Sequence, residues 1–544
     1  MQDLLLITIF LPLLGAALMW VVAPLGDRAV RWTALGVALL TLALAVNVVA
    51  AFPADGANSD SFAVKEASWL GANSLLNVKF ATGLDGLGVW MFGLSALLMV
   101  TAILVSWEAI SDRPALFYGM LLLLEFGCLG VFCARDIILF YVFFEFTLIP
   151  LFFLIGVWGS EQRRYAAIKF FLFTLAGSVL TFLGLLALVY LDFRNSGGVE
   201  MRFSIPALTQ SFTATPLPSS TQMWIFLALF AGFAIKVPLF PLHTWLPLAH
   251  VQAPTAGSVF LAGILLKIGT YGFLRFCLPM LPAATAAMMP WIMWLSVIGI
   301  IYGALVALVQ SDMKRLIAYS SVSHLGYCMI GLFALNQLGV QGGALQMINH
   351  GISTGGLFAI VGMIYERRHT RQISELRGLA RHAPWLAFAM LLFTFSSIGL
   401  PGMNGFAGEF LVLLGVFQLA FHDAPTAIAG QLQVLSVLAV SGVVLGAWYM
   451  LYLVQRVFFG PADAAGDEHV EHPDLKPREI AALAPLVVFI FWIGLQPRFF
   501  LDRMAPTLID LTESANLHVQ APVESIEPAV RTPAEDEEQI ARVR

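Results

Sequence analysis

The amino-acid sequence predicts an all-α polytopic membrane protein with about fourteen transmembrane helices, and three observations support this fold class. Hydrophobic residues make up 59% of the 544 residues and charged residues only 12%, whereas a soluble domain carries about 25% charged residues. The mean hydropathy is +0.84. The apolar residues gather in runs of about 20, the length that a membrane-spanning helix requires. This composition excludes a soluble enzyme, an extracellular scaffold, a nucleic-acid binder and a disordered protein.

The apolar runs place the predicted spans along the chain. The first run follows Met1 without the basic segment of a signal peptide, so we expect it to remain as a membrane helix. Two sizeable loops, 53–83 and 192–222, separate the runs. The fourteen predicted spans are 3–23, 30–52, 84–107, 114–134, 136–158, 165–191, 223–248, 254–278, 283–309, 312–333, 340–365, 384–421, 428–458 and 478–496.

The positions of Lys and Arg predict the orientation of these spans. Loops after odd-numbered spans hold sixteen basic residues, with Lys314 counted among them, and loops after even-numbered spans hold six. Basic residues accumulate on the cytoplasmic side of a membrane. We therefore expect both termini on the opposite, outer side.

The four cysteines give no sign of a metal cluster. Each lies in an apolar run, and no two form a CxxC pair of the kind that holds iron–sulfur clusters. We expect them to be small core residues. They are Cys128, Cys133, Cys277 and Cys328.

A few ionisable residues fall inside the predicted spans. Burying charge in a membrane costs roughly 2.5–3.5 kcal/mol or more, so such groups usually belong to ion or proton pathways. Histidine suits a relay because its ordinary pKa is about 6.5. The pattern therefore predicts a proton relay. Its seven candidate residues are Glu125, Glu145, Lys236, Lys267, His324, His350 and Glu409.

Each candidate also has a structural interpretation. The two lysines would then extend to the membrane surface, the two histidines would be hydrogen-bonded core residues, and Glu145 would stabilise a helix end. Glu125 would be the partner of a neighbouring Lys or Arg. The relay hypothesis is favoured because these groups occur on successive helices and no catalytic nucleophile with an orienting base accompanies them.

Two predicted helices are interrupted. Lys236 is followed by Pro238 and Pro241, and Glu409 follows Gly399, Pro401 and Gly402 in a run too long for one straight span. Paired Gly/Pro interruptions in corresponding halves of a membrane protein are typical of transporter sites. The breaks fall on helices 7 and 12, the fourth helix of each five-helix unit. Because five is odd, the second unit enters the membrane from the opposite side, which predicts inverted repeats.

This organisation divides the chain into five parts. They are three N-terminal helices in 1–113, a first repeat of helices 4–8 in 114–278, a second repeat of helices 9–13 in 279–460, a final helix in 461–497 and a polar tail in 498–544. The Pro, Glu and Gln content of the tail predicts disorder.

Three sequence blocks resemble a known family. The chain contains PLHTWLPLAHVQAPTAGSVFLAGILLKIGTYGFLRF, DIILFYVFFEFTLIPLFFLIGVWG and GLPGMNGFAGEFLVLLGVF. They resemble the antiporter-like subunits of proton-pumping NADH:quinone oxidoreductase, respiratory complex I, over about residues 84–460. HVQAPTAGS is more similar to the M-type subunits than to the L or N types.

The resemblance implies a role for each candidate residue. Glu145 and Lys236 would be the coupled pair of the first half-channel, and Lys267 the central relay. Glu409 would be the exit-side group, at a position where sister subunits usually carry Lys. His324 and His350 would be the connecting polar positions.

The resemblance also implies partners and location. The chain would hold no cofactor, while NADH, FMN, iron–sulfur clusters and quinone would be bound by partner subunits. Its neighbours would be the antiporter-like L and N chains in a bacterial inner membrane, with the lipid bilayer around them and no nucleic acid. The alternatives are an Mrp-type cation/proton antiporter or membrane-bound hydrogenase subunit, and a structural or quinone-lining scaffold.

Overall fold

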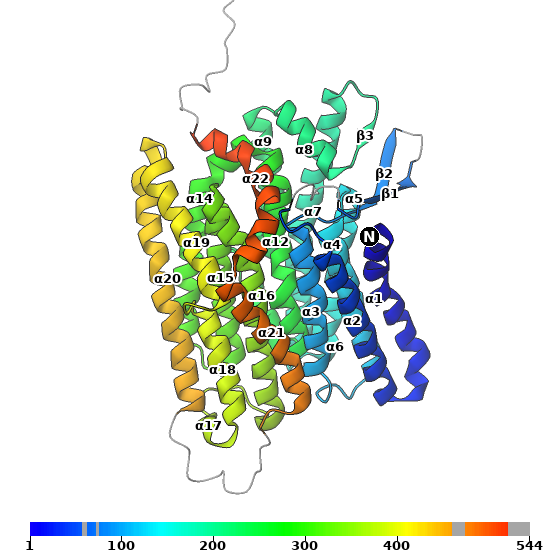
Figure 1. Ribbon diagram of the computed structural model, residues 1–544, viewed down its shortest axis with the longest axis vertical. Helices are drawn as coiled ribbons and strands as arrows, with labels where there is room; N and C mark the ends of the chain where they lie inside the picture. The colour runs from blue at the N-terminus through cyan, green and yellow to red at the C-terminus, as the bar shows by residue number, and fades with distance from the viewer. Residues whose placement is uncertain (57–61, 72–74, 460–473, 521–544) are drawn as a thin grey trace, which may run out of the picture.

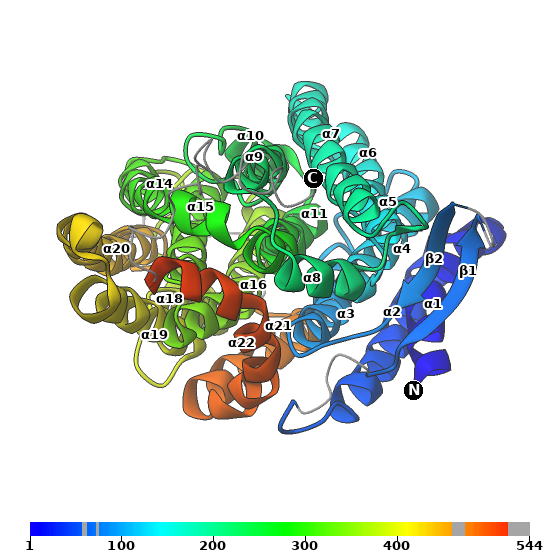
Figure 2. The ribbon, with the colours of Figure 1, turned by 90° about the horizontal axis from the view of Figure 1, so that it is seen from above.

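The computed structural model is a bundle of long, roughly parallel helices with a small β-sheet at one end (Figure 1). It describes residues 1–56, 62–71, 75–459 and 474–520. Seen from above, the bundle is elongated, with α1 and α2 at one side, α20 at the other and α16 near the centre (Figure 2).

Three N-terminal helices open the chain. A short 3-10 turn joins the first two into an antiparallel hairpin, and the third is almost completely buried behind them. These helices are α1 (Gln2–Val22), α2 (Asp27–Ala50) and α3 (Gly88–Val105).

The next group of helices occupies the region of the predicted first repeat. Residues 136–158, predicted as one span, form two consecutive helices that meet at Thr147. The helices are α4 (Pro114–Cys133), α5 (Ile137–Phe146), α6 (Leu148–Trp158), α7 (Arg163–Asn195), α8 (Ile205–Ala214), α9 (Ser219–Lys236), α10 (Trp245–Gln252), α11 (Thr255–Phe260), α12 (Leu266–Gly272) and α13 (Leu278–Met280).

The remaining helices contain the predicted second repeat and the C-terminal region. They are α14 (Pro282–Leu308), α15 (Met313–Leu332), α16 (Gln337–Arg368), α17 (Leu379–His382), α18 (Pro384–Ser397), α19 (Asn404–Gln418), α20 (Thr426–Phe458), α21 (Pro477–Leu495) and α22 (Arg498–Gln520).

All fourteen predicted spans are helical. Among the described residues, 12 helices are long and apolar enough to cross a membrane by length and composition. The two predicted spans outside this set are 223–248, which is divided between α9 and α10, and 312–333, whose helix α15 is rich in Ser and other polar residues. The chain is therefore a multi-pass α-helical membrane protein, as predicted.

Both predicted helix breaks are present. Helix α9 ends at Lys236 and the chain becomes helical again at Trp245, while α18 ends at Ser397 and α19 begins at Asn404. In the second break, Gly399 and Gly402 adopt φ values of +73° and +90°, which side chains with a Cβ rarely tolerate. Helix α7 packs against α9, and α16 packs against α19. In each half, the broken helix therefore packs against the long helix that corresponds to the third helix of the predicted repeat.

The loops at one end of the bundle contain a β-sheet that the sequence did not predict. Strands β1 (Lys65–Leu70) and β2 (Leu76–Thr82) are antiparallel, and β2 also pairs in parallel with β3 (Met201–Arg202). The sheet lies at the end of the bundle where α8 also lies (Figure 1). The two loops that the sequence left without structure are thus joined to each other.

Residues 498–520 correct the prediction of a disordered tail. They form the amphipathic helix α22, which packs against α13, α14 and α16. Its buried residues recur every three or four positions, the spacing of one helical face. They include Phe500, Met504, Leu508, Leu511, Ala515 and Val519. Average composition obscured this pattern because most of the Pro and Glu residues of the tail lie in 521–544, outside the described residues.

Candidate functional site

Lys267 lies fully buried at the centre of the bundle. Its helix, α12, is enclosed between two π-helical segments, Leu261–Leu265 and Phe273–Cys277. Such wide turns often occur at functional sites. The Lys267 ammonium donates to the backbone oxygen of Ala262, inside the first π-helical segment, so the irregular backbone supplies a partner for a charge that lipid cannot solvate.

His350 of α16 is the side-chain partner of Lys267. Its Nδ1 lies 2.7 Å from Lys267 Nζ, and only 3% of the residue is exposed. Nε2, on the far side of the ring, has no hydrogen-bond partner in the described part of the chain. One ring nitrogen of His350 thus contacts the lysine, and the other is free to exchange a proton.

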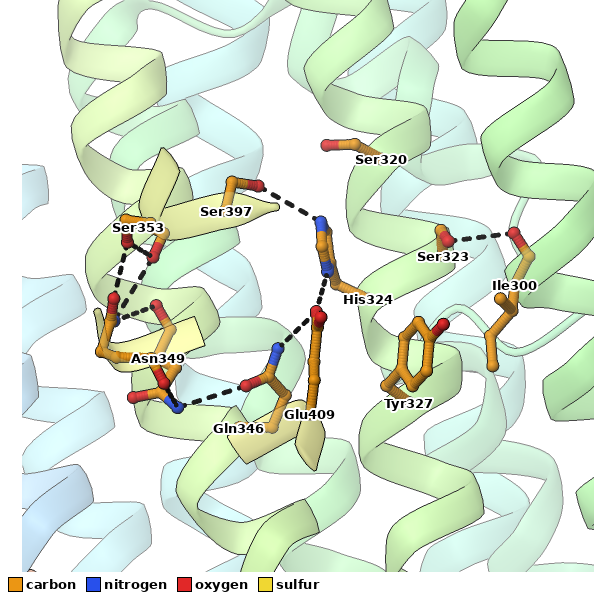
Figure 3. Close-up of polar contacts among 12 residues, drawn as sticks. Ile300, Ser320, Ser323, His324, Tyr327, Gln346, Asn349, Ser353, Ser397 and Glu409 are labelled. Atoms are coloured by element: carbon orange, nitrogen blue, oxygen red, sulfur yellow. Dashed lines mark hydrogen bonds and ion pairs between the residues drawn. The ribbon is translucent and has the colours of Figure 1, made fainter. Parts of the chain in front are cut away.

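His324 of α15 connects to Glu409 of α19. His324 Nδ1 lies 3.1 Å from Glu409 Oε1, and Gln346 Nε2 donates to the same carboxylate oxygen over 3.1 Å. Figure 3 shows the histidine and the glutamine converging on this oxygen. The other ring nitrogen, His324 Nε2, faces two hydroxyls, Ser397 at 3.2 Å and Tyr449 at 3.3 Å.

The two histidines bring these pairs into one line. Their ring centroids are 5.9 Å apart, too far for a direct hydrogen bond. A small cavity of about 10 Å³, lined by both histidines and by Ser397, lies at this point. One water molecule needs a cavity of about this size with polar partners. Lys267, His350, His324 and Glu409 therefore form a nearly continuous buried polar line across four helices.

A cluster of amides and hydroxyls fixes the geometry of the second broken helix. Asn404, the first residue of α19, donates to the backbone oxygen of Asn349 over 3.3 Å, and Asn349 donates to the backbone oxygen of Asn404 over 2.7 Å. The Ser396 hydroxyl donates to Asn404 Oδ1 over 2.6 Å and is hydrogen-bonded to the Ser353 hydroxyl at 2.6 Å. These bonds hold the break against α16, so Glu409 and His350 are positioned by the same helix.

Glu145 and Lys236 come close but do not bond. They are near enough to interact electrostatically, but no hydrogen bond or ion pair joins these two described residues. The Lys236 ammonium lies 4.3 Å from the centroid of the Phe144 ring, a cation–π contact. Glu145 Oε1 is buried without a partner.

Asp136 positions the short helix that carries Glu145. Its carboxylate accepts from the backbone N–H groups of Ile138 at 2.8 Å, Leu139 at 3.3 Å and Lys79 at 3.1 Å, capping α5 and tying it to β2. Burial raises the pKa of Asp136 to about 6, although these backbone N–H donors oppose the shift.

Glu125 stands apart from the polar line. The residue is fully buried in α4, and neither carboxyl oxygen has a hydrogen-bond partner within the described residues. No Lys or Arg forms an ion pair with it within these residues, so the described part of the chain offers no support for the interpretation of Glu125 as the partner of a basic residue. A buried carboxyl group without a partner is costly.

Several residues near the line were missed by sequence reasoning. His250 of α10 is fully buried, stacks on Phe358 with ring centroids 4.5 Å apart, and has no partner for either ring nitrogen in the described chain. It lies two residues beyond the predicted span. Lys314, counted as a loop residue, is buried and donates to the backbone oxygen of Ala253 at 2.5 Å. Three further partners, Gln346, Ser397 and Tyr449, carry no charge at neutral pH. A charge inside an apolar run was the signal that marked the candidates, so the sequence does not single these residues out.

Within the described residues, neither the cysteines nor other potential ligands are arranged as a metal centre. All four cysteines are buried and free of disulfides, and no group of three or more His, Cys, Asp or Glu residues in the described ranges is placed to hold a metal ion.

Fold and site together define a class: a multi-pass membrane protein with a buried line of ionisable side chains. Comparison with known proteins identifies the family. A family model described as "NADH:quinone oxidoreductase/Mrp antiporter, TM" matches residues 134–432. The NADH-quinone oxidoreductase subunit M of Rhodobacter capsulatus is 42% identical, over 94% of this chain and 97% of the relative. Subunit M of Pseudomonas aeruginosa is 38% identical, over 92% and 96%. The chain therefore belongs to the NADH:quinone oxidoreductase/Mrp antiporter family.

Solved structures agree with this assignment. A chain of respiratory complex I from Thermus thermophilus matches with a TM-score of 0.81 and 32% identity, covering 94% of this chain and 99% of that one. A chain of the Mrp complex from Dietzia sp. matches with a TM-score of 0.76 and 22% identity, covering 99% and 59%. The second likeness shows the fold alone.

Proposed function

We propose that this chain is the M-type proton-translocating subunit in the membrane arm of an NADH:quinone oxidoreductase. The observation that carries the proposal is the buried line Lys267–His350–His324–Glu409, which has the donors and acceptors that a proton relay requires. Relatives of similar length that are named as subunit M support it.

The proposed relay passes a proton along these four residues in turn. A proton leaves Lys267 Nζ for His350 Nδ1 over 2.7 Å, and His350 then releases the proton of its free Nε2 into the small cavity. His324 takes up a proton at Nε2 and gives the one on Nδ1 to Glu409 over 3.1 Å. Each imidazole thus gains one proton and loses one, and only Lys267 and Glu409 change charge. The line is reset when Glu409 releases its proton, both imidazoles return to their starting tautomers and Lys267 is protonated again.

Glu145 and Lys236 would drive or sense the charge on Lys267. Lys236 and Glu145 are not locked by a hydrogen bond, so their interaction depends on the surrounding charges. We infer that protonation of Lys267 repels the Lys236 ammonium toward Glu145, and that its deprotonation lets the lysine return. Energy from redox chemistry would reach this chain through its neighbours.

The partners and location follow from the same proposal. The antiporter-like L and N chains would flank this subunit, and NADH, FMN, iron–sulfur clusters and quinone would be held by other subunits. The chain would lie in a bacterial inner membrane with both termini on the outer side. The excess of Lys and Arg in loops after odd-numbered spans supports this orientation.

Proton pumping in inverted membrane vesicles tests the proposal. Lys267→Ala and Glu409→Gln should each remove most proton uptake that is coupled to NADH oxidation, while the amount of assembled complex stays near that of the wild type. Tyr327→Phe is a matched control, because Tyr327 is buried on the same helix as His324 but donates only to the backbone oxygen of Ala439. If Lys267→Ala prevents assembly but the complex that forms pumps normally, the lysine is a structural residue and the relay is wrong.

A further inference from the structure

A second cavity lies away from the proton line, between α2, α3, α16, α21 and α22. Its volume is about 460 Å³, within the range of about 300–1,000 Å³ typical of ligand pockets. Apolar side chains such as Val46, Leu97, Ile352 and Phe489 line it, and Arg503 is the one charged residue among the lining residues. The cavity is therefore an apolar space with a single cation.

The cavity has the depth of one lipid leaflet. Its α2 wall runs from Leu42 to Ala50, about 12 Å at 1.5 Å per residue, against about 15 Å for half of the hydrocarbon core. Gly86 N–H donates to Thr507 Oγ1 over 3.0 Å, which joins α22 to the start of α3 at the sheet end. Arg503, one turn before Thr507, thus lies near the membrane surface, and Ile352 lies deeper.

Trp90, one of the lining residues, carries a buried hydrogen-bond donor. The residue is only 7% exposed, and its ring packs on that of Phe500 with centroids 4.6 Å apart. Its Nε1–H is buried without a partner in the described chain. A buried indole N–H usually finds an acceptor, so a ligand with a carbonyl oxygen would satisfy a donor that the protein leaves unpaired.

Arg503 supplies a cation with unused donors. Its guanidinium stacks on the Phe499 ring at 3.9 Å and donates through Nη1 to the Phe499 backbone oxygen at 2.9 Å. No carboxylate of the described chain forms an ion pair with it. An arginine side chain has five N–H donors that match the geometry of phosphate, so most of them remain available to an anion.

We propose that this cavity binds one phospholipid of the leaflet at the sheet end. An acyl chain would occupy the apolar space, the phosphodiester would bind Arg503, and an ester carbonyl would accept from Trp90 Nε1–H. A quinone would also present carbonyl oxygens, but it has no anionic group for Arg503. The inference does not depend on the proton relay, since none of its residues belongs to that line.

Photo-crosslinking of the purified, assembled complex in vesicles tests the site. The probes are phosphatidylglycerol and diacylglycerol that carry the same diazirine acyl chain. We expect phosphatidylglycerol to label peptides from 88–105 and 477–495 about tenfold more than diacylglycerol does, the value of one charge-assisted hydrogen-bonded contact. Equal labelling by both probes would show a merely apolar cavity and overturn the proposal.

Three variants and one control locate the effect. Val46 is 55% exposed and lines the cavity, so Val46→Phe should narrow the cavity and lower labelling severalfold without disturbing the core. Arg503→Gln should remove the preference for phosphatidylglycerol, and Trp90→Phe should weaken labelling severalfold. Ala17→Phe is the control, since it fills a comparable cavity of about 310 Å³ that no charged residue lines; it should change nothing at α3 and α21.

Turnover of NADH and quinone verifies that the variant complexes are assembled, and should be unchanged in Val46→Phe. Labelling that is not reduced in Val46→Phe, or that excess quinone displaces better than excess phosphatidylglycerol does, would overturn the assignment.

Discussion

The two halves of the bundle hold their ionisable side chains in different ways. In the second half, both ring nitrogens of His324 have partners, and Glu409 accepts from His324 and Gln346. In the first half, Lys267 bonds across to the second half, but Lys236 lies over an aromatic ring, and Glu145 Oε1 has no partner within the described residues. Hydrogen bonds fix geometry and transfer protons, whereas unbonded charges respond to other charges. From this difference we expect Lys236 and Glu145 to respond to nearby charge and the bonded residues of the second half to conduct protons.

The largest effect should come from removing the responsive charges. We expect Glu145→Ala and Lys236→Ala each to lower coupled NADH:quinone turnover about 100-fold, as when a positioned proton donor or acceptor is lost. Assembly should remain largely intact because neither side chain makes a hydrogen bond that holds helices together. Turnover in purified complex, normalised to its amount, measures this. Arg164→Ala, which removes an exposed charge from the start of α7, is the control. Unimpaired turnover in both variants would contradict the proposed role of Glu145 and Lys236.

The next effect concerns stability and should be confined to the second half. Asn404→Ala removes the side-chain bonds to the Asn349 backbone oxygen and the Ser396 hydroxyl and should cost about 1–3 kcal/mol, the penalty for leaving buried polar groups unpaired. Thermal inactivation of the assembled complex measures the loss. Ser441→Ala, which removes a bond only within its own helix, should have little effect. Equal inactivation temperatures for the two variants would show that the cluster does not hold the break.

A smaller effect should reveal redundancy around His324. Tyr449→Phe and Ser397→Ala each remove one of two hydroxyls at the same nitrogen, so each should slow coupled turnover by less than about fivefold, the value of one neutral hydrogen bond. The double variant should lose more than the product of the single losses, because the nitrogen then has no partner. A loss in the double variant equal to the product of the two single losses would mean that the hydroxyls act independently.

The smallest effect should appear in the pH dependence of stability. Because burial raises the pKa of Asp136 to about 6, the folded chain binds a proton between about pH 4 and pH 6 that the unfolded chain has already released. The stabilising contribution of this proton is complete below about pH 4 and lost as the pH rises through 6. Asp136→Asn keeps a capping oxygen and should flatten this decline. Thermal inactivation across that range tests it, and identical slopes would contradict it.

The sequence predicted the helices well because membrane solvation leaves few alternatives. A run of 20 apolar residues must satisfy its own backbone, and Pro or Gly at 238, 241, 399 and 402 interrupts that pattern in a visible way. In the structure, four of the seven candidate residues, Lys267, His350, His324 and Glu409, lie in one line. That the relay uses them stays a prediction.

Other features were hidden for physical reasons. The β-sheet joins residues far apart in sequence, which local patterns do not encode. Neutral partners such as Tyr449 and Gln346 leave no charge signal, and His250 fell outside a span because the predicted span ended at 248, four residues before α10 ends at Gln252. Helix α22 was visible in its apolar spacing, but averaging over a longer polar segment concealed it.

The two π-helical segments around Lys267 have a mechanical consequence. Each residue advances an α-helix by about 100° around its axis, and a π turn accommodates one extra residue. If the segment Leu261–Leu265 narrowed to an α turn while Phe273–Cys277 accommodated the displaced residue, α12 would rotate about its own axis between the two segments. The Lys267 ammonium would then swing away from His350 without displacing either end of the helix, which is a way to open and close a proton path inside a rigid bundle.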